Sequence, residues 1–426
     1  MVEPIMPIPC PTADPRAFLT ALFDCAVMVA DPMQVVPAHL PDRPKGRLVI
    51  IGAGKASARM AEAVEAHLGP CEGLVITRYG YARPLQGITL VEAAHPVPDA
   101  TGAQATKNML ELVAGLGPDD LVLALISGGG SALLCAPAAG LDLDQKMAVN
   151  AALLASGAPI GEMNVVRKHL SRVKGGQLAA ACHPAPLLSL LISDVPGDDP
   201  AHIASGPTVG ETSTAADALD ILQKRQIAVP DAALAVLRQG SGVIALDDLR
   251  LATSETRIIA APSQSLATAA KEARAAGVDV RLLGDALEGE ARELGASQAR
   301  LALSLRAEAT KTGQPILLLS GGECTVTRRG DGIGGPNAEF TLAAAITLQG
   351  AAGIHIIACD TDGVDGAAEI AGAYAGPDSL NGRMDAQAAL ANNDAHSFFE
   401  TTQGHIITGP TLTNVNDFRA ILILPK

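Results

Sequence analysis

Two glycine-rich segments in the first half of the sequence contain residue types that suit the binding of an anion. GAGKAS (52–57) joins an apolar run to an Ala-rich stretch, and Lys55 adds a positive charge there. ISGGGSALL (126–134) follows another apolar run and carries three consecutive glycines between two serines. Glycine lets the backbone approach a ligand closely, and amides at a helix N-terminus bind phosphate or carboxylate groups. The candidate binding residues are Gly52, Gly54, Lys55, Ser127, Gly128, Gly129, Gly130 and Ser131.

Each segment also has a simpler interpretation. GAGKAS lacks the spacing of a P-loop, and as a dinucleotide fingerprint it has Ser57 where Gly or Ala is expected. Arg78, at the end of the next apolar run, would suit a 2′-phosphate, so NADP binding stays open. The alternative is a tight turn with a solvated lysine. For ISGGGSALL the alternative is a glycine turn that allows close helix–strand packing.

A basic segment and an acidic segment follow. NVVRKHLSRVKGGQLA (164–179) is the densest basic stretch of an acidic protein. Helical spacing would place Lys168 and Arg172 on one face, and likewise Arg167 and Lys174. We expect Arg172 and Lys174 to add charge to an anion site. The alternative is a solvated helix face.

Asp194 and Asp198 follow an apolar run in the acidic segment LISDVPGDDPAHIASGPT (191–208). Carboxylates at a strand end can hold Mg²⁺ or take a proton. The alternative is an Asp-rich turn with helix caps. We take Asp194 and Asp198 as catalytic candidates.

The second half of the sequence repeats the combination of glycine and acidic residues after apolar runs. The segments are LSGGECTVT (319–327), GDGIGGPNAEF (330–340) and ACDTDGVDG (358–366). Open α/β sheets bind ligands at the carboxyl ends of their strands, which is where these segments are predicted to lie. The candidates here are Gly321, Gly322, Glu323, Asn337, Glu339 and Asp362, the last also as a metal ligand.

The elements that must position these residues alternate between short apolar runs and Ala-rich stretches. The runs predict strands at 47–54, 73–78, 88–93, 121–130 and 187–194, and at 257–261, 278–283, 315–322, 353–360, 404–408 and 420–424. The stretches between them predict helices, and strand–helix alternation is typical of parallel sheets. We expect an α/β protein of two domains, 1–240 and 250–426, each a mostly parallel sheet flanked by helices.

Composition excludes several functions. The net charge of −14 and an aromatic content of 2% argue against nucleic-acid binding through phosphates or base stacking. The seven cysteines contain no CxxC pair and are interpreted as apolar fillers. We see no signal peptide and no apolar run long enough for a membrane span, so a cytoplasmic location is expected.

Eight motifs, in order, give the chain a resemblance to a known family. They are GAGKAS, ISGGGSALL, VRKHLSRVKGGQLA, SDVPGDDPAHIASGPT, LSGGECTV, GGPNAEF, DTDGVDG and TNVNDF. Over nearly its whole length the chain resembles the class II glycerate kinases, whose C-terminal half is called the MOFRL domain. Many members carry the name hydroxypyruvate reductase.

The resemblance implies ATP-dependent phosphorylation of D-glycerate to 2-phosphoglycerate with Mg²⁺, on two α/β domains with a ligand cleft between them. It also implies an essential role for the GAGKA lysine, which is Lys55 here. The family usually has an Arg in GGRNxE, and this chain has Pro336 at that position. Arg328, Arg329 or the basic segment would then have to supply the missing cation.

Two other functions stay open. One is an NADP-dependent hydroxypyruvate reductase, which would use GAGKAS and Arg78. The other is a non-catalytic protein that binds a phosphoacid. In every case we expect small-molecule ligands, with no nucleic acid and no membrane, and a monomer or homodimer.

Overall fold

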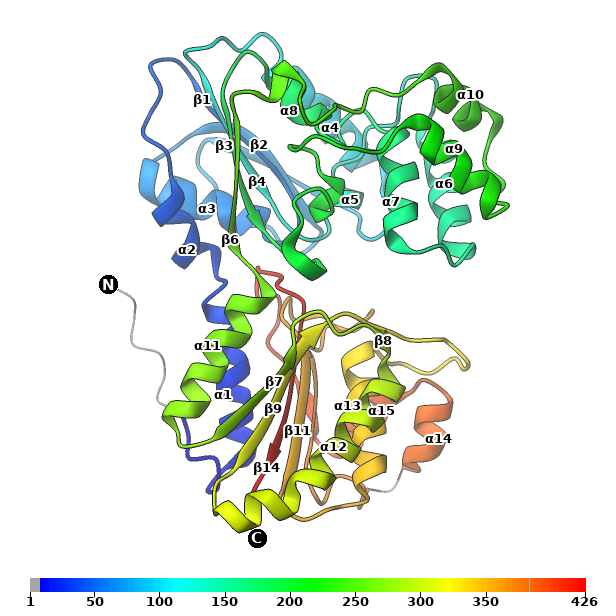
Figure 1. The fold of residues 1–426 in the computed structure, drawn as a ribbon. Coiled ribbons are helices and arrows are strands. Elements are labelled where there is room, and N and C mark those ends of the chain that lie inside the picture. The colour runs from blue at the N-terminus through cyan, green and yellow to red at the C-terminus, as the bar shows by residue number, and fades with distance from the viewer. Residues whose placement is uncertain (1–7, 383) are drawn as a thin grey trace. The chain divides into compact units, whose positions relative to one another are not determined.

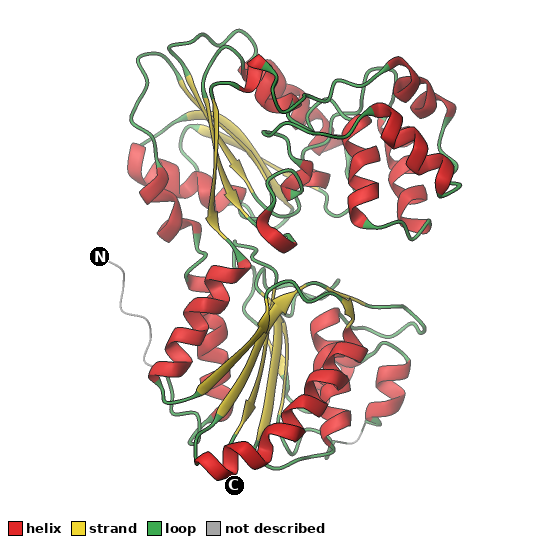
Figure 2. Ribbon diagram, in the orientation of Figure 1, coloured by secondary structure: helices red, strands yellow, loops and turns green. Residues whose placement is uncertain are grey.

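The computed structural model describes residues 8–382 and 384–426, which form two compact units. The first unit comprises Val35–Asp194 and Asp198–Ile259. The second unit comprises Ala260–Lys426 together with residues 195–197 and the described part of the chain before Val35. Each unit has its own sheet with helices on both faces (Figure 2).

The first unit contains a six-stranded sheet in the order β3-β2-β1-β4-β5-β6. Its strands are β1 (Leu48–Ala53), β2 (Glu72–Arg78), β3 (Ile88–Ala93), β4 (Leu121–Ile126), β5 (Leu187–Ile192) and β6 (Ser254–Ala260). The pairings from β3 to β5 are all parallel. Every residue of β1 and β5 is buried, as expected for central parallel strands covered on both faces. This confirms the predicted parallel sheet for the first half.

The strand order reverses direction between β1 and β4. Helix α3 (Ser57–Leu68) follows β1 on one face, whereas α4 (Ala100–Val113) connects β3 to β4 across the other face (Figure 1). Loops that leave neighbouring strands toward opposite faces open a crevice, which is the usual ligand position in such sheets. The segments after β1 and β4 are GAGKAS and ISGGGS. The topology therefore brings the two predicted anion-binding loops together.

A group of helices beside this sheet has its own apolar core. It contains α6 (Leu143–Ala155), α7 (Ile160–His169), α9 (Ala215–Lys224) and α10 (Asp231–Gln239). The remaining short helices of the unit are α5 (Gly130–Leu133) and α8 (Gln177–Cys182). The basic segment does not form one helix as predicted, because α7 ends at His169 and Ser171 pairs with Pro137 in an isolated bridge. Arg172 and Lys174 therefore lie outside α7 and share no helix face with Lys168 and Arg167.

The second unit has a six-stranded sheet in the order β13-β12-β11-β14-β9-β7 and a two-stranded sheet of β8 and β10. The strands are β7 (Asp279–Gly284), β8 (Gly289–Glu290), β9 (Ile316–Gly322), β10 (Cys324–Thr325), β11 (Ile354–Asp360), β12 (Gly372–Ala375), β13 (His405–Ile406) and β14 (Asp417–Ile423). Helices α1 (Pro15–Met28) and α11 (Pro262–Ala275) cover one face (Figure 1). Helices α12 (Ala291–Thr312) and α13 (Pro336–Leu348) cover the other. Shorter helices are α2 (Pro32–Val35), α14 (Ala386–Ala391) and α15 (Ala395–Thr401).

The prediction of a mostly parallel sheet is wrong for this second unit. Among the described residues of its six-stranded sheet, only β7 and β9 pair in parallel, whereas β14 is antiparallel to both β9 and β11, and β12 is antiparallel to β11 and β13. The short strands β8 and β10 also pair in parallel. The crossover through α13 does keep β9 and β11 in the same direction, as helix alternation predicts. The C-terminal strand β14 then inserts between them in the opposite direction, which local periodicity cannot reveal.

The division into units also differs from the predicted one in two places. Strand β6, predicted to open the second domain, completes the sheet of the first unit. Helix α1 belongs to the second unit, because its buried Phe18, Leu22 and Phe23 pack on that sheet, with the rings of Phe23 and Phe418 5.8 Å apart. These are contacts between the two ends of the sequence.

Within the described residues no single helix has the length and composition of a membrane span; only the bent pair Pro15–Met28 and Pro32–His39 meets that test, in combination. All seven cysteines are free and all but Cys10 are buried, which agrees with their interpretation as apolar fillers.

Candidate active site

The two loops at the reversal point bind each other through the backbone amides of the first loop. The amide of Lys55 donates to Gly128 O at 2.8 Å, and the amide of Ala56 donates to Ser127 Oγ at 3.0 Å. The amides of Gly54 and Ser57 donate to Ile76 O and Gly54 O. GAGKAS was expected to offer open amides to an anion. These four donors instead have protein partners, so the loop can contribute the Lys55 side chain but not this group of amides.

The glycines of GAGKAS have a packing reason. Gly54 has φ +144°, and a Cβ there would lie 2.1 Å from Ser127 Oγ. A Cβ at Gly52 would lie 2.5 Å from Leu125 O on the neighbouring strand. The close approach of the two loops therefore requires both residues to be glycine. Gly52 and Gly54, predicted as ligand-binding residues, position β1 and its loop against β4.

Three residues meet where the second loop turns. Gly129 has φ +79°, and a Cβ there would lie 3.2 Å from Lys55 Cγ and 3.2 Å from His95 Nε2. The imidazole and the lysine side chain therefore flank the glycine loop. The sequence analysis missed His95. It follows β3, whose carboxyl end lies at the same sheet edge as those of β1 and β4, and that position was the available signal.

Side-chain hydrogen bonds hold the glycine loop (128–131) in place. Ser127 is fully buried and its hydroxyl accepts the amide of Ala56, so this predicted ligand group serves to join the loops. Ser131 Oγ lies 2.7 Å from Ser205 Oγ, and Ser131 O accepts from Lys174 Nζ at 2.7 Å. The amide of Gly130, the first residue of α5, donates to Ser127 O at 3.2 Å. The amides of Gly128, Gly129 and Ser131 are therefore the better candidates for backbone contacts to an anion.

The predicted carboxylates lie after β5, next to this loop in the sheet order. Asp194 is half-buried just past the end of β5. Asp198 has φ +55°, and its Oδ1 is buried without a hydrogen-bond partner among the described residues. Ala204 and Ser205, which pack against the glycine loop, also have positive φ values of +51° and +63°. Non-glycine residues in this region store strain, and such strain concentrates at functional sites.

The two predicted cations of the basic segment have different environments. Arg172 is exposed, whereas Lys174 is only 2% exposed. Burial, followed by the positive charge of Lys146, lowers the pKa of Lys174 to about 7. Lys168, which precedes both residues in the same segment, forms a buried ion pair with Glu211. Arg172 is therefore the cation of this segment that is open to solvent.

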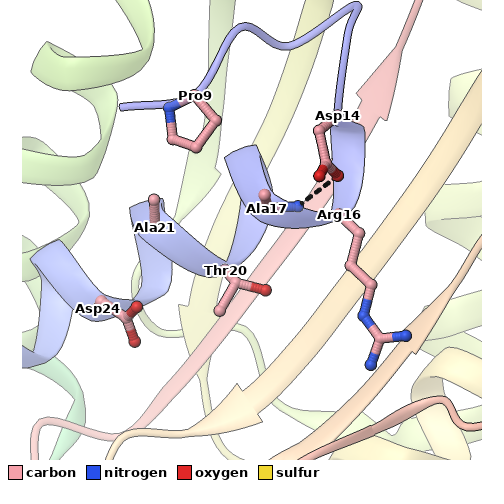
Figure 3. A pocket seen from close by; sticks show the side chains of 7 residues that line it. All are labelled: Pro9, Asp14, Arg16, Ala17, Thr20, Ala21 and Asp24. Carbon is pink, nitrogen blue, oxygen red and sulfur yellow. Dashed lines mark hydrogen bonds between the residues drawn. The ribbon is translucent and has the colours of Figure 1, made fainter. Parts of the chain in front are cut away.

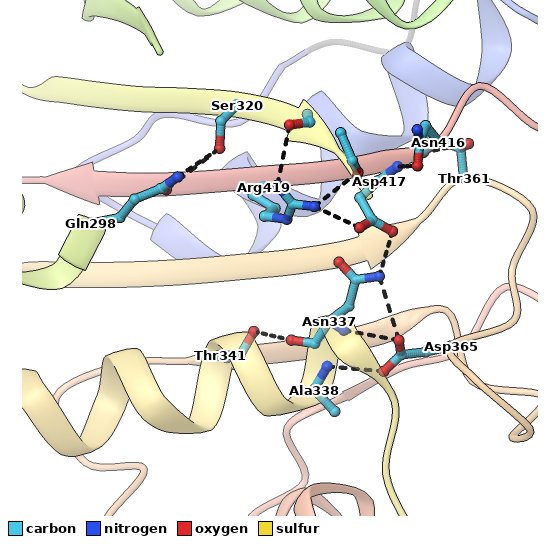
Figure 4. Close-up of polar contacts among 12 residues, drawn as sticks. Gln298, Ser320, Asn337, Ala338, Thr341, Thr361, Asp365, Asn416, Asp417 and Arg419 are labelled. Atoms are coloured by element: carbon cyan, nitrogen blue, oxygen red, sulfur yellow. Dashed lines mark hydrogen bonds and ion pairs between the residues drawn. The ribbon is translucent and has the colours of Figure 1, made fainter. Parts of the chain in front are cut away.

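A buried polar network occupies the predicted site of the second unit (Figure 4). The Asp365 carboxylate accepts the amides of Asn337 and Ala338, both at 2.9 Å, at the start of α13. Asn337 Nδ2 donates to Asp417 Oδ1 at 2.7 Å. The N-terminus of α13, which was expected to face a ligand, therefore already holds a carboxylate of the protein. Pro336 is the first residue of α13.

The carbonyl groups of the SGG segment in this unit are also bound by protein. Arg419 donates to Gly321 O at 3.1 Å, to Gly322 O at 2.8 Å and to Asp417 Oδ2 at 2.6 Å. Burial raises the pKa of Asp417, against the opposing charge of Arg419. Gly322 has φ +109°, and a Cβ there would lie 2.3 Å from Leu287 N. Of the candidates in this segment, Glu323 alone is exposed.

The last two candidates of the second unit are buried as well. Glu339 is 2% exposed and accepts from Arg292 Nε at 2.8 Å and from Asn393 Nδ2 at 2.9 Å. Asp362 is fully buried, and its Oδ1 accepts the amide of Val364 at 2.8 Å. Both carboxylates therefore accept hydrogen bonds from within the unit. The described residues contain no group of three or more His, Cys, Asp or Glu side chains suited to hold a metal ion.

A separate hollow beside α1 contains none of the predicted site residues (Figure 3). It is lined by Pro9, Asp14, Arg16, Ala17, Thr20, Ala21 and Asp24. Asp14 there accepts the amide of Ala17 at 2.9 Å and so caps α1. Arg16, also in this hollow, donates to His405 O at 3.3 Å.

Comparison with known proteins places the chain in a family. Residues 18–238 match a family described as a domain of unknown function (DUF4147), and residues 316–417 match the MOFRL family. A protein of Agrobacterium vitis named after hydroxypyruvate reductase is 51% identical over 416 residues, which are 96% of this chain and 94% of that protein. The D-glycerate 2-kinase of Thermotoga maritima is 36% identical over 400 residues, 92% of this chain and 94% of that one.

The fold agrees with that relationship. The crystal structure of the glycerate kinase from Thermotoga maritima has a TM-score of 0.84 at 34% identity, covering 95% of this chain and 97% of that chain. An α/β fold that brings an anion loop, a lysine and carboxylates to one sheet edge suits a small-molecule phosphotransferase. The chain belongs to the MOFRL-containing glycerate kinase family, whose members carry both the kinase and the reductase name.

Proposed function

We propose that this protein transfers the γ-phosphoryl group of ATP to the 2-hydroxyl group of D-glycerate, or of a closely related small hydroxy acid. The product from glycerate is 2-phosphoglycerate. The observation that carries the proposal is the meeting of Lys55, His95 and the Gly128–Ser131 loop at the reversal point of the first sheet. Relatives named as glycerate kinases support the choice of reaction.

Phosphoryl transfer requires mainly positioning and neutralisation of charge. Lys55 would stabilise the charge of the transferring group, and the Gly128–Ser131 loop would bind a phosphate or the substrate carboxylate through its amides. Arg172, which is exposed, would add a cation. Asp194 or Asp198 would orient the attacking hydroxyl group.

The carboxylates after β5 also fit Mg²⁺ that arrives with ATP. The buried Asp198 Oδ1 has no hydrogen-bond partner among the described residues, and carboxylate oxygen is the ligand that Mg²⁺ prefers. Because these residues contain no cluster of three metal-binding side chains, Asp194 and Asp198 would share the ion with the nucleotide phosphates. The ion would supply charge neutralisation to those phosphates.

The reductase alternative is disfavoured by the first loop. A dinucleotide pyrophosphate binds to the amides between the first strand and its helix. Here the amides of Lys55 and Ala56 donate to the neighbouring loop instead. Arg78, the residue suited to a 2′-phosphate, has its guanidinium carbon 5.4 Å from the centre of the Tyr81 ring.

The remaining parts of the proposal concern partners. The net charge of −14 supports small-molecule substrates and no nucleic acid. We propose a cytoplasmic monomer or homodimer that binds no membrane.

One assay separates the three functions. Purified protein is mixed with D-glycerate and MgATP, and separately with hydroxypyruvate and NADPH. We expect ADP and, by coupling to enolase, 2-phosphoglycerate in the first mixture only. Oxidation of NADPH in the second mixture would identify a reductase, and no reaction in either would identify a binding protein.

The role of Lys55 is tested by Lys55→Ala, with Lys107→Ala as the control because Lys107 is an exposed lysine of the same unit. Loss of one preorganised charge raises the barrier by roughly 3–5 kcal/mol. The Lys55 variant should therefore be nearly inactive with unchanged circular dichroism. Retention of more than about a tenth of the wild-type rate would remove Lys55 from this role.

A further inference from the structure

Two lysines are buried beneath the glycine loop of the first unit. Lys174 is 2% exposed and Lys146 is 3% exposed, whereas lysine is almost never buried without a paired charge. Lys174 Nζ donates to Ser131 O at 2.7 Å, and Lys146 Nζ donates to Leu170 O at 3.3 Å. Both recorded partners are backbone carbonyl groups, which satisfy hydrogen bonds but carry no negative charge.

The charged and titratable groups that act on Lys174 come from three elements. Lys146 lies on α6, Arg167 and Lys168 lie on α7, and the thiol of Cys135 follows α5. Lys168 has its own counter-ion in Glu211. The strongest influences on Lys174 include no carboxylate, and burial also lowers the pKa values of Lys146 and Arg167. The buried side of the loop therefore holds several basic side chains whose charged forms are disfavoured.

The carbonyl group that Lys174 contacts belongs to the loop that is proposed to bind the ligand. Ser131 ends the Gly128–Ser131 loop, and its hydroxyl group lies 2.7 Å from that of Ser205. A Cβ at Gly129, in the same loop, would lie 3.2 Å from Lys55 Cγ and 3.2 Å from His95 Nε2. A movement of Ser131 O would therefore shift the loop amides relative to Lys55.

We propose that Lys174 is a positioning residue for the Gly128–Ser131 loop: its ammonium group holds Ser131 O from the buried side, and anion binding at the loop strengthens that contact by favouring the charged amine. This inference rests on the proposed function of the loop. Lys174 would act through Ser131, so it need not touch the ligand, although sequence analysis placed it among the ligand-binding residues.

Proton uptake follows from this arrangement. Burial and Lys146 lower the pKa of Lys174 to about 7, so the free protein holds a mixture of charged and neutral amine near neutral pH. A bound anion favours the charged form. At pH 7.5 the protein would take up as much as about 0.8 proton per anion, since a group with that pKa is about one quarter protonated there. Affinity for the anion would fall as pH rises above 7.

The experiment first establishes that the wild-type protein binds MgATP and phosphorylates D-glycerate. If it does neither, the proposed function fails and the role of Lys174 fails with it. If it does, calorimetry of MgATP and of D-glycerate binding is performed at pH 7.5 in two buffers of different ionisation enthalpy. The difference in heat gives the number of protons taken up.

Three variants then test the residue itself. Lys174→Met should abolish the proton uptake, raise KM for the anion bound at the loop about tenfold or more, and remove the dependence of that KM on pH between 6 and 9. Lys174→Arg, charged throughout this range, should also show a pH-independent KM but one close to the wild-type value. Lys146→Met should raise the pKa of Lys174, so that its uptake at pH 7.5 decreases and its alkaline limb shifts upward.

Lys107→Met is the matched control, because it removes an exposed lysine of the same unit. It should leave uptake, KM and the pH profile unchanged. The proposal is overturned if the wild type takes up no proton, or if Lys174→Met keeps the wild-type KM and pH profile. Should Lys174→Met fail to fold, Lys174→Arg decides the matter: a KM in that variant that keeps the wild-type dependence on pH also overturns the proposal.

Discussion

Removal of the Asp365 carboxylate should greatly destabilise the second unit. Asp365 is fully buried and accepts the amides of Asn337 and Ala338 at 2.9 Å each. It also lies 3.3 Å from His396 Nε2. A hydrogen bond to a charged group contributes about 1.5–3 kcal/mol, so two of them give roughly 3–6 kcal/mol. Asp365→Ala should therefore lower the free energy of unfolding by about 4 kcal/mol, because it leaves buried donors without partners.

The chain offers a matched control in Asp385. This carboxylate also caps a helix through two amides, those of Gln387 at 2.8 Å and Ala388 at 3.2 Å, but it is exposed. Loss of an exposed cap costs about 1 kcal/mol, because water replaces the carboxylate. The difference between the two variants thus isolates the effect of burial.

Urea unfolding followed by circular dichroism measures both variants, and hydrogen exchange of the α13 amides locates the change. We expect the protection of Asn337 and Ala338 to fall first in Asp365→Ala. If the two variants differ by less than about 1 kcal/mol, or if exchange at the start of α13 is unaffected, the carboxylate does not anchor the helix as argued.

Three further predictions concern the ionisation of Glu211, the requirement for Mg²⁺ and the proline at position 336. Burial raises the pKa of Glu211, but the hydrogen bond and charge of Lys168, together with hydrogen bonds from the amides of Ser213 and Thr212, outweigh burial and lower the pKa to about 2. These contacts should stabilise the protein above pH 4.5 by at most about 3 kcal/mol, because solvent screens part of the effect, and this stability should be lost as pH drops from 4.5 to 2. Glu211→Gln should flatten that acid limb in urea titrations. Chelation of metal ions by EDTA should abolish kinase activity. Metal analysis of the purified protein without nucleotide should find less than about 0.1 Mg²⁺ per chain. Stoichiometric metal would contradict the proposal that the carboxylates share Mg²⁺ with the nucleotide phosphates. Pro336→Arg should change KM for D-glycerate less than about tenfold, because residue 336 is the first residue of α13 and its amide has no helical partner. If the wild type is inactive and this substitution restores activity, no other cation of the protein compensates for the missing arginine.

Local sequence patterns were sufficient for the strands of the first unit. Apolar runs such as LVIIGA and LLSLLI are buried on both faces, and parallel central strands are the structure that accommodates such runs. Because parallel strands bring their carboxyl ends to one edge, the predicted strands imply that the segments with Lys55, Gly129 and Asp194 begin at the same edge of the sheet. The pairing of Lys55 N with Gly128 O agrees with this.

Sequence patterns failed where the outcome depended on pairing between distant segments. No local signal tells that β14 inserts between β9 and β11, or that α1 packs on a sheet formed more than 200 residues later. The surroundings of the predicted ligand groups Asn337 and Glu339 could not be foreseen for the same reason. Their partners, Asp417 and Arg292, come from other elements and only become visible in three dimensions.

The sequence by itself therefore determined the α/β class, the apolar strands and the position of the glycine loops, because these depend on residue type and short-range periodicity. Only the tertiary structure decided which polar groups remain available to bind a ligand or to take part in a reaction. It paired the GAGKAS amides with Gly128 and Ser127, brought both His95 and Lys55 close to Gly129, and buried Lys174 next to Ser131. A polar group is available to a ligand only when the fold has not already satisfied it, and that balance is set by contacts between segments far apart in the chain.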